Sequence, residues 1–183
     1  MRLSSLLLLI LFGVSGCNVS GEKALTIKEY FDLDSLLDHQ IELIANSNLK
    51  LDKKVMLDGQ IEEKTFDPDT AMLTGEFKII REFDLNKTNY IGAYEVISNG
   101  GITKYLLKPG QNSPVDYLEI QKGSDGKLEQ LKGVFFEDKE IYQHQREIQI
   151  IFKNGQISAY SIKGYQHMIM KDTVQFLTQA IIR

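Results

Sequence analysis

Cys17 is the only thiol in this chain of 183 residues, and it follows directly after three small or aliphatic residues, Val14, Ser15 and Gly16. A thiolate is a nucleophile and a metal ligand. However, a single cysteine cannot form an intramolecular disulfide, and it excludes the zinc sites that are built from several cysteines. Its position close to the N-terminus makes covalent modification the chemistry to consider first.

The residues before Cys17 have the pattern of a secretory signal peptide. Arg2 supplies one positive charge, and the seven residues from Leu6 to Phe12 are all large and apolar. Small residues then lead up to Cys17, as they do at a signal-peptide cleavage site. Because the apolar run is far shorter than the roughly 20 residues that span a bilayer, the pattern predicts a cleaved signal and not a transmembrane helix.

The run Val14-Ser15-Gly16-Cys17 resembles the lipobox of bacterial lipoproteins, in which an aliphatic residue and two small residues precede an obligatory cysteine. The resemblance implies that residues 1–16 are removed, that the thiol of Cys17 receives a diacylglycerol, and that its new amino group is usually acylated. Two or three chains would hold the protein stably, since each buried CH₂ contributes roughly 0.8 kcal/mol. Residues 17–24 would then be a lipidated tether. Asn18 stands where an aspartate would retain such a protein in the inner membrane, which implies the periplasmic face of the outer membrane.

The three histidines, His39, His144 and His167, do not have the spacing of a metal site. None lies within four residues of another, whereas zinc ligands on one helix or loop usually do. The sequence also lacks a nucleophile elbow, a P-loop and a G-x-G-x-x-G motif. We therefore predict no catalytic, metal-binding or cofactor-binding residue, although His144 and Arg146 on one strand face could bind an anion.

The composition is that of an ordinary globular protein, with 43% hydrophobic and 25% charged residues. A net charge of −4 at pH 7 argues against nucleic acid as a partner, because binding to phosphates requires a basic surface. Residues 25–183 have the length of a single domain. A domain of this size buries enough surface to fold without a disulfide.

An amphipathic helix is predicted at the start of this domain. Thr26-Ile27-Lys28-Glu29 has the sequence of a capping box, and Asn46-Ser47-Asn48 would close the helix. A break near Asp34 would divide it into two shorter helices. His39 lies on the polar face. The apolar face consists of Ile27, Phe31, Leu37, Ile41 and Ile44.

The remainder of the domain has mostly the pattern of strands. Val55, Leu57, Gly59 and Ile61 alternate with polar residues, which predicts one half-buried strand. Residues 71–84 fit a helix or a strand, and helix is preferred because residues 71–73 are good helix formers. Later strands are predicted near residues 90–98, 101–108, 115–122, 127–136, 141–152, 156–163, 165–171 and 174–182, and most of these are separated by turn sequences such as Asn-Gly and Asp-Gly. The predicted class is α+β, with the N-terminal helix, and possibly the second helix, packed on an antiparallel meander sheet of about seven to nine strands.

Three blocks of this domain look like blocks shared by uncharacterised lipoproteins of Bacteroidota. They are Phe83-Asp84-Leu85-Asn86-Lys87, Gly92-Ala93-Tyr94 and the seven residues from Tyr160 to Gln166. The similarity would cover most of the mature chain. That family has no assigned activity, so the resemblance implies no reaction.

Three functions remain open. The lipobox, the expected fold and the lack of catalytic motifs favour a non-enzymatic binding or assembly module of the cell envelope, whose partners are the membrane, through acylated Cys17, and an envelope protein or lipid. The first alternative is a carrier of a lipid or other hydrophobic ligand in a half-barrel cavity, which Met168 and Met170 could line if they are not ordinary core. The second is a hydrolase that uses His144 or His167. A cavity of roughly 300 Å³ or more between helix and sheet would favour the carrier, and a solid core with an exposed apolar patch would favour the module.

Overall fold

The computed structural model describes residues 28–183, so the predicted signal peptide, the lipobox and Cys17 lie outside the described residues. Within this range the chain forms the α-helices α1 (Leu33–Ala45) and α2 (Thr70–Arg81) and the 3-10 helix η1 (Thr88–Tyr90). The strands are β1 (Leu51–Leu57), β2 (Gln60–Phe66), β3 (Tyr94–Asn99), β4 (Ile102–Leu107), β5 (Val115–Lys122), β6 (Leu128–Lys139), β7 (Tyr142–Lys153), β8 (Gln156–Met168) and β9 (Val174–Ile182). In residues 28–183, neither helix has the length and apolar character needed to cross a membrane.

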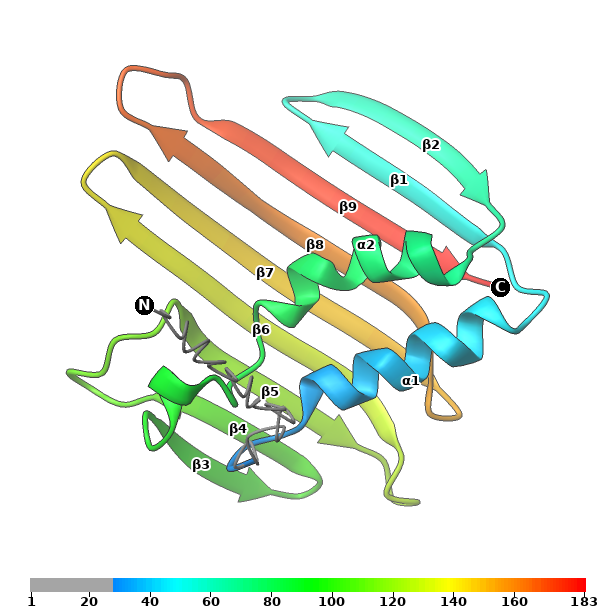
Figure 1. Ribbon diagram of the computed structural model, residues 1–183, viewed down its shortest axis with the longest axis horizontal. Coiled ribbons are helices and arrows are strands. Elements are labelled where there is room, and N and C mark those ends of the chain that lie inside the picture. Colours follow the sequence, from blue (N-terminus) through cyan, green and yellow to red (C-terminus); the bar gives the residue numbers. More distant parts are fainter. Residues whose placement is uncertain (1–27) are drawn as a thin grey trace, which may run out of the picture.

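The nine described strands form one antiparallel sheet in the order β2-β1-β9-β8-β7-β6-β5-β4-β3 (Figure 1). From β3 to β9 each strand pairs with the next one along the chain, which confirms the predicted meander. The β1–β2 hairpin comes first in the chain but joins the sheet beside its last strand. There β1 pairs with β9, from Leu51 opposite Ile182 to Leu57 opposite Phe176. The two ends of the domain are therefore held together.

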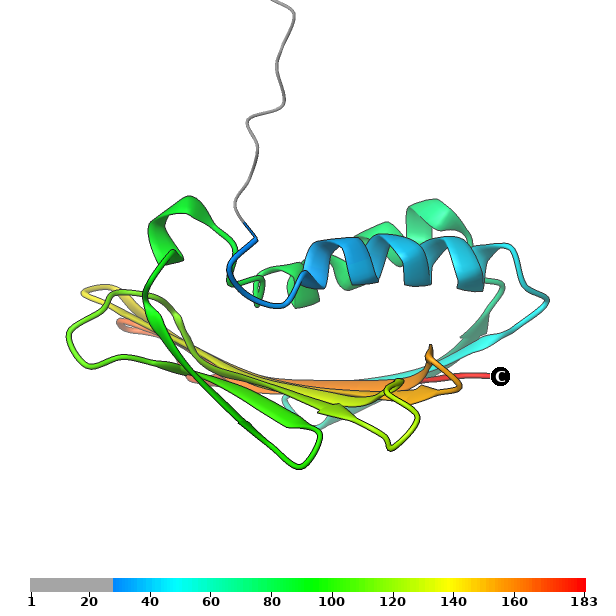
Figure 2. The same ribbon diagram turned by 90° about the horizontal axis from the view of Figure 1, so that it is seen from below.

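Both helices lie on the same face of the curved sheet, and no described segment covers the opposite face (Figure 2). The ring of Phe77 on α2 meets that of Tyr160 on β8 edge to face, with 5.7 Å between the centroids. The predicted α+β fold, with amphipathic helices on an antiparallel sheet, is confirmed. The large apolar side chains that the helices bury recur at helical spacing: Leu33, Leu37, Ile41, Ile44, Leu73, Phe77 and Ile80.

The chain after α2 packs directly on the sheet at Gly133 of β6. The ring of the fully buried Phe83 lies over this glycine. A Cβ at position 133 would come within 2.7 Å of Cδ1 of Phe83. The absence of a side chain at Gly133 therefore lets residues 83–87 pack against the core.

The start of α1 differs from the prediction. Residues 28–32 are not helical, and Asp32 is the N-cap, with its Oδ1 accepting a hydrogen bond from the backbone N–H of Ser35 at 3.1 Å. Thr26 and Ile27 of the predicted capping box lie outside the described residues. The helix is continuous through Asp34, so the alternative with two shorter helices is wrong. The later start has a tertiary cause, because the backbone of Tyr30 and Phe31 is bonded to the side chain of Asn86.

Two strand predictions were wrong. Asp58 and Gly59 have φ angles of +48° and +83° and form the tight turn between β1 and β2, where one continuous strand was predicted. An Asp-Gly pair suits this turn because both central residues need a positive φ. In contrast, β8 runs unbroken through Gly164, where two strands were predicted. The helix predicted over residues 71–84 is confirmed as α2, which Asp69 caps.

Met168 and Met170 neither line a cavity nor belong to the core. Met168 is 38% exposed at the end of β8, and Met170 is 98% exposed in the turn that follows. The predicted strand extended to residue 171, but β8 ends at Met168, where the chain leaves the sheet. Both interpretations of these methionines were therefore wrong.

Candidate functional site

The three histidines do not form a site. His39 is exposed on α1. His144 and His167 lie on the neighbouring strands β7 and β8, but their register places them on opposite faces of the sheet, because His144 is opposite Gln166. Within residues 28–183, no three His, Cys, Asp or Glu side chains come together to hold a metal ion.

Arg146 and His144 share the helix-covered face of β7, as the sequence predicted, but Arg146 already has an anionic partner. Its side chain is buried, and its Nη2 lies 2.6 Å from Oε2 of Glu82, just after α2. Its guanidinium stacks over the ring of Phe135 at 4.4 Å from the centroid. An external anion would have to displace Glu82, so the geometry makes Arg146 a structural link between α2 and the sheet.

His144 lies beside this link, with its Nδ1 3.4 Å from Nη2 of Arg146. Burial, followed by the positive charge of Arg146, lowers the pKa of His144 below its usual range. At neutral pH this shift favours the neutral form of the imidazole. A neutral imidazole beside an already paired guanidinium does not attract an anion, which further weakens the predicted anion site.

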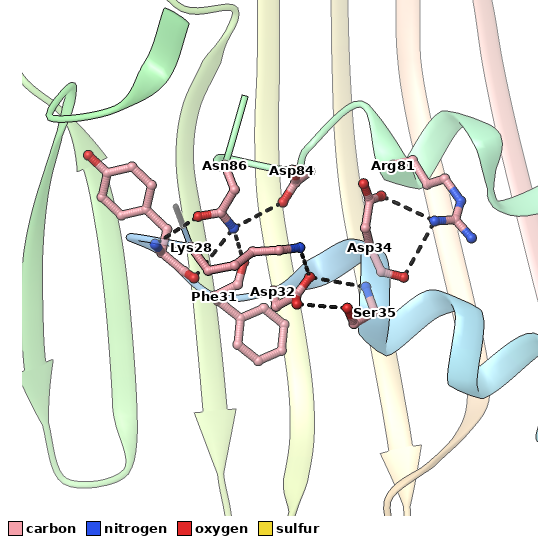
Figure 3. A network of polar contacts seen from close by, with 9 residues as sticks. Lys28, Phe31, Asp32, Asp34, Ser35, Arg81, Asp84 and Asn86 are labelled. Atoms are coloured by element: carbon pink, nitrogen blue, oxygen red, sulfur yellow. Dashed lines mark hydrogen bonds and ion pairs between the residues drawn. The ribbon is translucent and has the colours of Figure 1, made fainter. Parts of the chain in front are cut away.

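Asn86 forms the centre of a polar network at the point where the described chain enters the domain (Figure 3). Its Oδ1 accepts a hydrogen bond from the backbone N–H of Tyr30 at 2.9 Å, and its Nδ2 donates to the carbonyl of Phe31 at 3.0 Å and to Asp84 at 3.3 Å. Asn86 and Asp84 are both buried, and burial raises the pKa of Asp84. Residues 83–87 therefore fix residues 30–31 to the body of the domain.

Ion pairs extend this network to both helices (Figure 3). Nζ of Lys28 lies 2.6 Å from Oδ1 of Asp32, and Nη1 of Arg81 on α2 lies 3.2 Å from Oδ1 of Asp34 on α1. A second nitrogen of Arg81 pairs with Asp38. The network thus joins the incoming segment, α1 and the end of α2.

We expect Asn86→Ala to destabilise the domain by about 1–3 kcal/mol, because it leaves the buried backbone N–H of Tyr30 without its partner and removes one donor from the carbonyl of Phe31. The midpoint of urea unfolding measures this change. Asn112→Ala, which removes the same amide from an exposed loop residue, is the matched control and should leave the midpoint unchanged. Equal midpoints for the two variants would contradict the role of Asn86.

A groove of about 700 Å³ lies on the face of the sheet that the helices do not cover. Strand register places its lining on that face. Lys53 contacts Glu76 of α2 on the covered side, so its neighbour Lys54 points to the other side. Lys54 is opposite Gln179, and Gln179 is opposite Ser161. The floor comes from β7, β8 and β9 and consists of Gln149, Ile151, Ala159, Ser161, Gln179 and Ile181.

The β1–β2 hairpin and the C-terminus form the wall of this groove, and four of their charged side chains form two ion pairs. Asp52 accepts a hydrogen bond from Oγ1 of Thr65 at 2.6 Å and lies 2.5 Å from Nε of Arg183. These two contacts hold the pKa of Asp52 below its usual value. Nζ of Lys54 lies 2.8 Å from Oε1 of Glu63. Because these two acids and two bases neutralise one another, the groove suits a neutral ligand that forms hydrogen bonds.

No protein-family model, curated protein or solved structure matches this chain. What the chain does is therefore inferred from its own residues.

The groove was not found from the sequence. Polar residues such as Gln149, Ser161 and Gln179 alternate with buried ones along their strands, and this alternation marks an open sheet face. The wall depends on the pairing of β1 with β9, which no local pattern indicates.

Proposed function

We propose that this protein is a lipid-anchored component of the bacterial cell envelope and acts as a non-enzymatic binding module. The groove on the uncovered sheet face carries this proposal, because its volume of about 700 Å³ is that of a small-ligand site. Its floor offers amide and hydroxyl groups beside aliphatic side chains, which suits a neutral ligand rich in hydrogen-bonding groups, such as a glycan.

The lipobox-like run that ends at Cys17 supports the anchored location, and Asn18 favours the periplasmic face of the outer membrane. Acyl chains on Cys17 would keep the domain at the membrane without a spanning segment. The network around Asn86 holds residues 30–31 to the domain and so links the anchored segment to the fold.

The packing under the helices favours this module over a lipid carrier. A carrier needs a hollow between the helices and the sheet. In residues 28–183 that space contains side chains without any exposed surface, among them Leu37, Leu73, Phe77 and Phe83. Because the space between helices and sheet is filled, we place the ligand site on the uncovered face of the sheet.

The paired charges favour binding over hydrolysis. General acid–base catalysis needs a titratable group that is free to exchange a proton with the substrate. In the groove, Asp52 is bonded to Thr65 and Arg183, and Glu63 is paired with Lys54. These groups are suited to shaping a ligand site and not to proton transfer.

Native mass spectrometry of the protein isolated from its membrane tests the proposal. We expect wild type to carry a non-covalent adduct that is lost in Ser161→Trp, since an indole at the centre of the floor would obstruct the groove where the ligand lies. Gln121→Trp, on the same sheet face but outside the groove, should keep the adduct. A wild type without an adduct, or an adduct retained in Ser161→Trp, would refute the groove as the binding surface.

A further inference from the structure

Four exposed apolar residues lie at one end of the sheet, on two adjacent turns. They are Ile141 between β6 and β7, and Met168, Ile169 and Met170 at the end of β8; we name these four residues the apolar tip. Ile141 is 65% exposed, Ile169 is 56% exposed and Met170 is 98% exposed, so the two turns present large apolar side chains to the solvent. Such a surface normally marks a contact with another molecule or with a membrane.

The apolar tip is held in a defined shape. The backbone N–H of Ile169 donates a hydrogen bond to the carbonyl of Ile141 at 3.1 Å, which fastens one turn to the other. Nδ1 of His167 lies 3.0 Å from Oγ1 of Thr173 and braces the second turn from within. The four side chains are therefore presented on a preformed scaffold.

Met170 has an unfavourable conformation for its type. Its φ is +62°, in the left-handed region that glycine and asparagine adopt most readily. Its side chain, at 98% exposure, gains almost no packing in return. A glycine or asparagine would form the same turn at lower cost, so a contact outside the described chain would explain a large apolar residue here.

We propose that the apolar tip inserts into the interfacial layer of the bilayer to which Cys17 is attached. This inference rests on the proposed lipid anchor. The eleven residues from 17 to 27 can span at most about 40 Å, so the described domain stays close to the membrane surface. In Figure 1 the two turns lie at the upper left of the view, the start of the described chain lies at the lower left and the C-terminus lies at the right.

The size and charge of the apolar tip favour lipid over a protein partner. Stable protein interfaces use about 20–30 residues on each side, far more than these two turns provide. The charged residues beside the tip are of both signs, with Lys139 and Lys171 next to Glu140 and Asp172. Insertion would therefore depend on apolar burial and not on attraction to anionic headgroups. The anchor makes even weak insertion effective, because the tip stays at high local concentration.

A single-tryptophan experiment tests this inference, because the chain contains no tryptophan. Ile169→Trp places the reporter on the apolar tip. Ile181→Trp is the matched control, since Ile181 is also 56% exposed. Ile181 lies near the C-terminal end of β9, whereas the second turn precedes the N-terminal end of this strand. Each protein, beginning at Cys17, is coupled through its only thiol to maleimide lipid in phosphatidylcholine vesicles. Anchoring in this assay does not depend on lipidation in cells.

We expect brominated phosphatidylcholine to quench Ile169→Trp roughly twofold, because side chains that lie about 5–10 Å into the headgroup boundary reach the labelled acyl chains. Ile181→Trp should not be quenched. Adding Met170→Asp to Ile169→Trp should remove most of the quenching, and 1 M salt should not. Equal quenching of the two reporters, or none, would overturn membrane insertion and leave the tip as a protein contact. Because the coupling is chemical, that result would be separate from any failure of the proposed lipid anchor.

Discussion

Replacement of Cys17 by serine is expected to release this protein from the membrane. The lipobox-like run Val14-Ser15-Gly16-Cys17 follows directly after the apolar segment, and attachment of the diacylglycerol forms a thioether that requires sulfur. A hydroxyl cannot replace the thiol in this step. The variant should therefore incorporate no radiolabelled palmitate, while wild type should be labelled in a bacterium that has the lipoprotein-processing enzymes.

Wild type and Cys17→Ser should also differ in their location in the cell. Wild type should enter the membrane fraction and the detergent phase, and a salt wash should not release it, because burial of acyl chains is not screened by ions. Cys17→Ser should either remain uncleaved or behave as a soluble envelope protein. Its fold should not change, since Cys17 is the only cysteine and forms no intramolecular disulfide.

Ser15→Ala is the matched control, because it keeps a small residue at this position of the lipobox-like run. It should be labelled and retained in the membrane like wild type. Absence of label in wild type, or equal label in wild type and Cys17→Ser, would contradict lipidation at this residue.

Ile41→Asp is expected to cause a large loss of stability. Ile41 is 4% exposed on the face of α1 that packs over the sheet. An aspartate there would place an unpaired charge among apolar side chains, and we expect the free energy of unfolding to fall by about 3 kcal/mol or more. For a domain of this size, such a loss lowers the melting temperature by roughly 6–12 °C.

His39→Ala is the matched control for this prediction, because His39 lies two residues earlier on the same helix and is exposed. Its melting temperature should remain close to that of wild type. Thermal unfolding followed by circular dichroism measures both variants. If Ile41→Asp and His39→Ala had the same melting temperature, the apolar face of α1 would not stabilise the core.

The elements whose pattern is local were predictable from the sequence. The burial of Leu37, Ile41 and Ile44 follows from the period of a helix, and the turns from β3 to β9 follow mostly from Gly-containing turn pairs. The Asp58-Gly59 pair is also a hairpin-turn sequence, but the alternation of apolar residues on both sides of it led to the prediction of one continuous strand. The candidate lipid attachment at Cys17 likewise depends on a contiguous run of residues.

Other features depend on residues that lie far apart in the chain, and only the tertiary structure decided them. Leu51 pairs with Ile182, and this pairing builds the wall of the groove. Asn86 bonds Tyr30 and so ends the incoming segment before α1 begins. Each contact closes a loop of more than fifty residues, and its partner is chosen by the packing of the whole sheet. A sequence pattern records the period and the turns of a segment, but it does not record which distant segment supplies the partner.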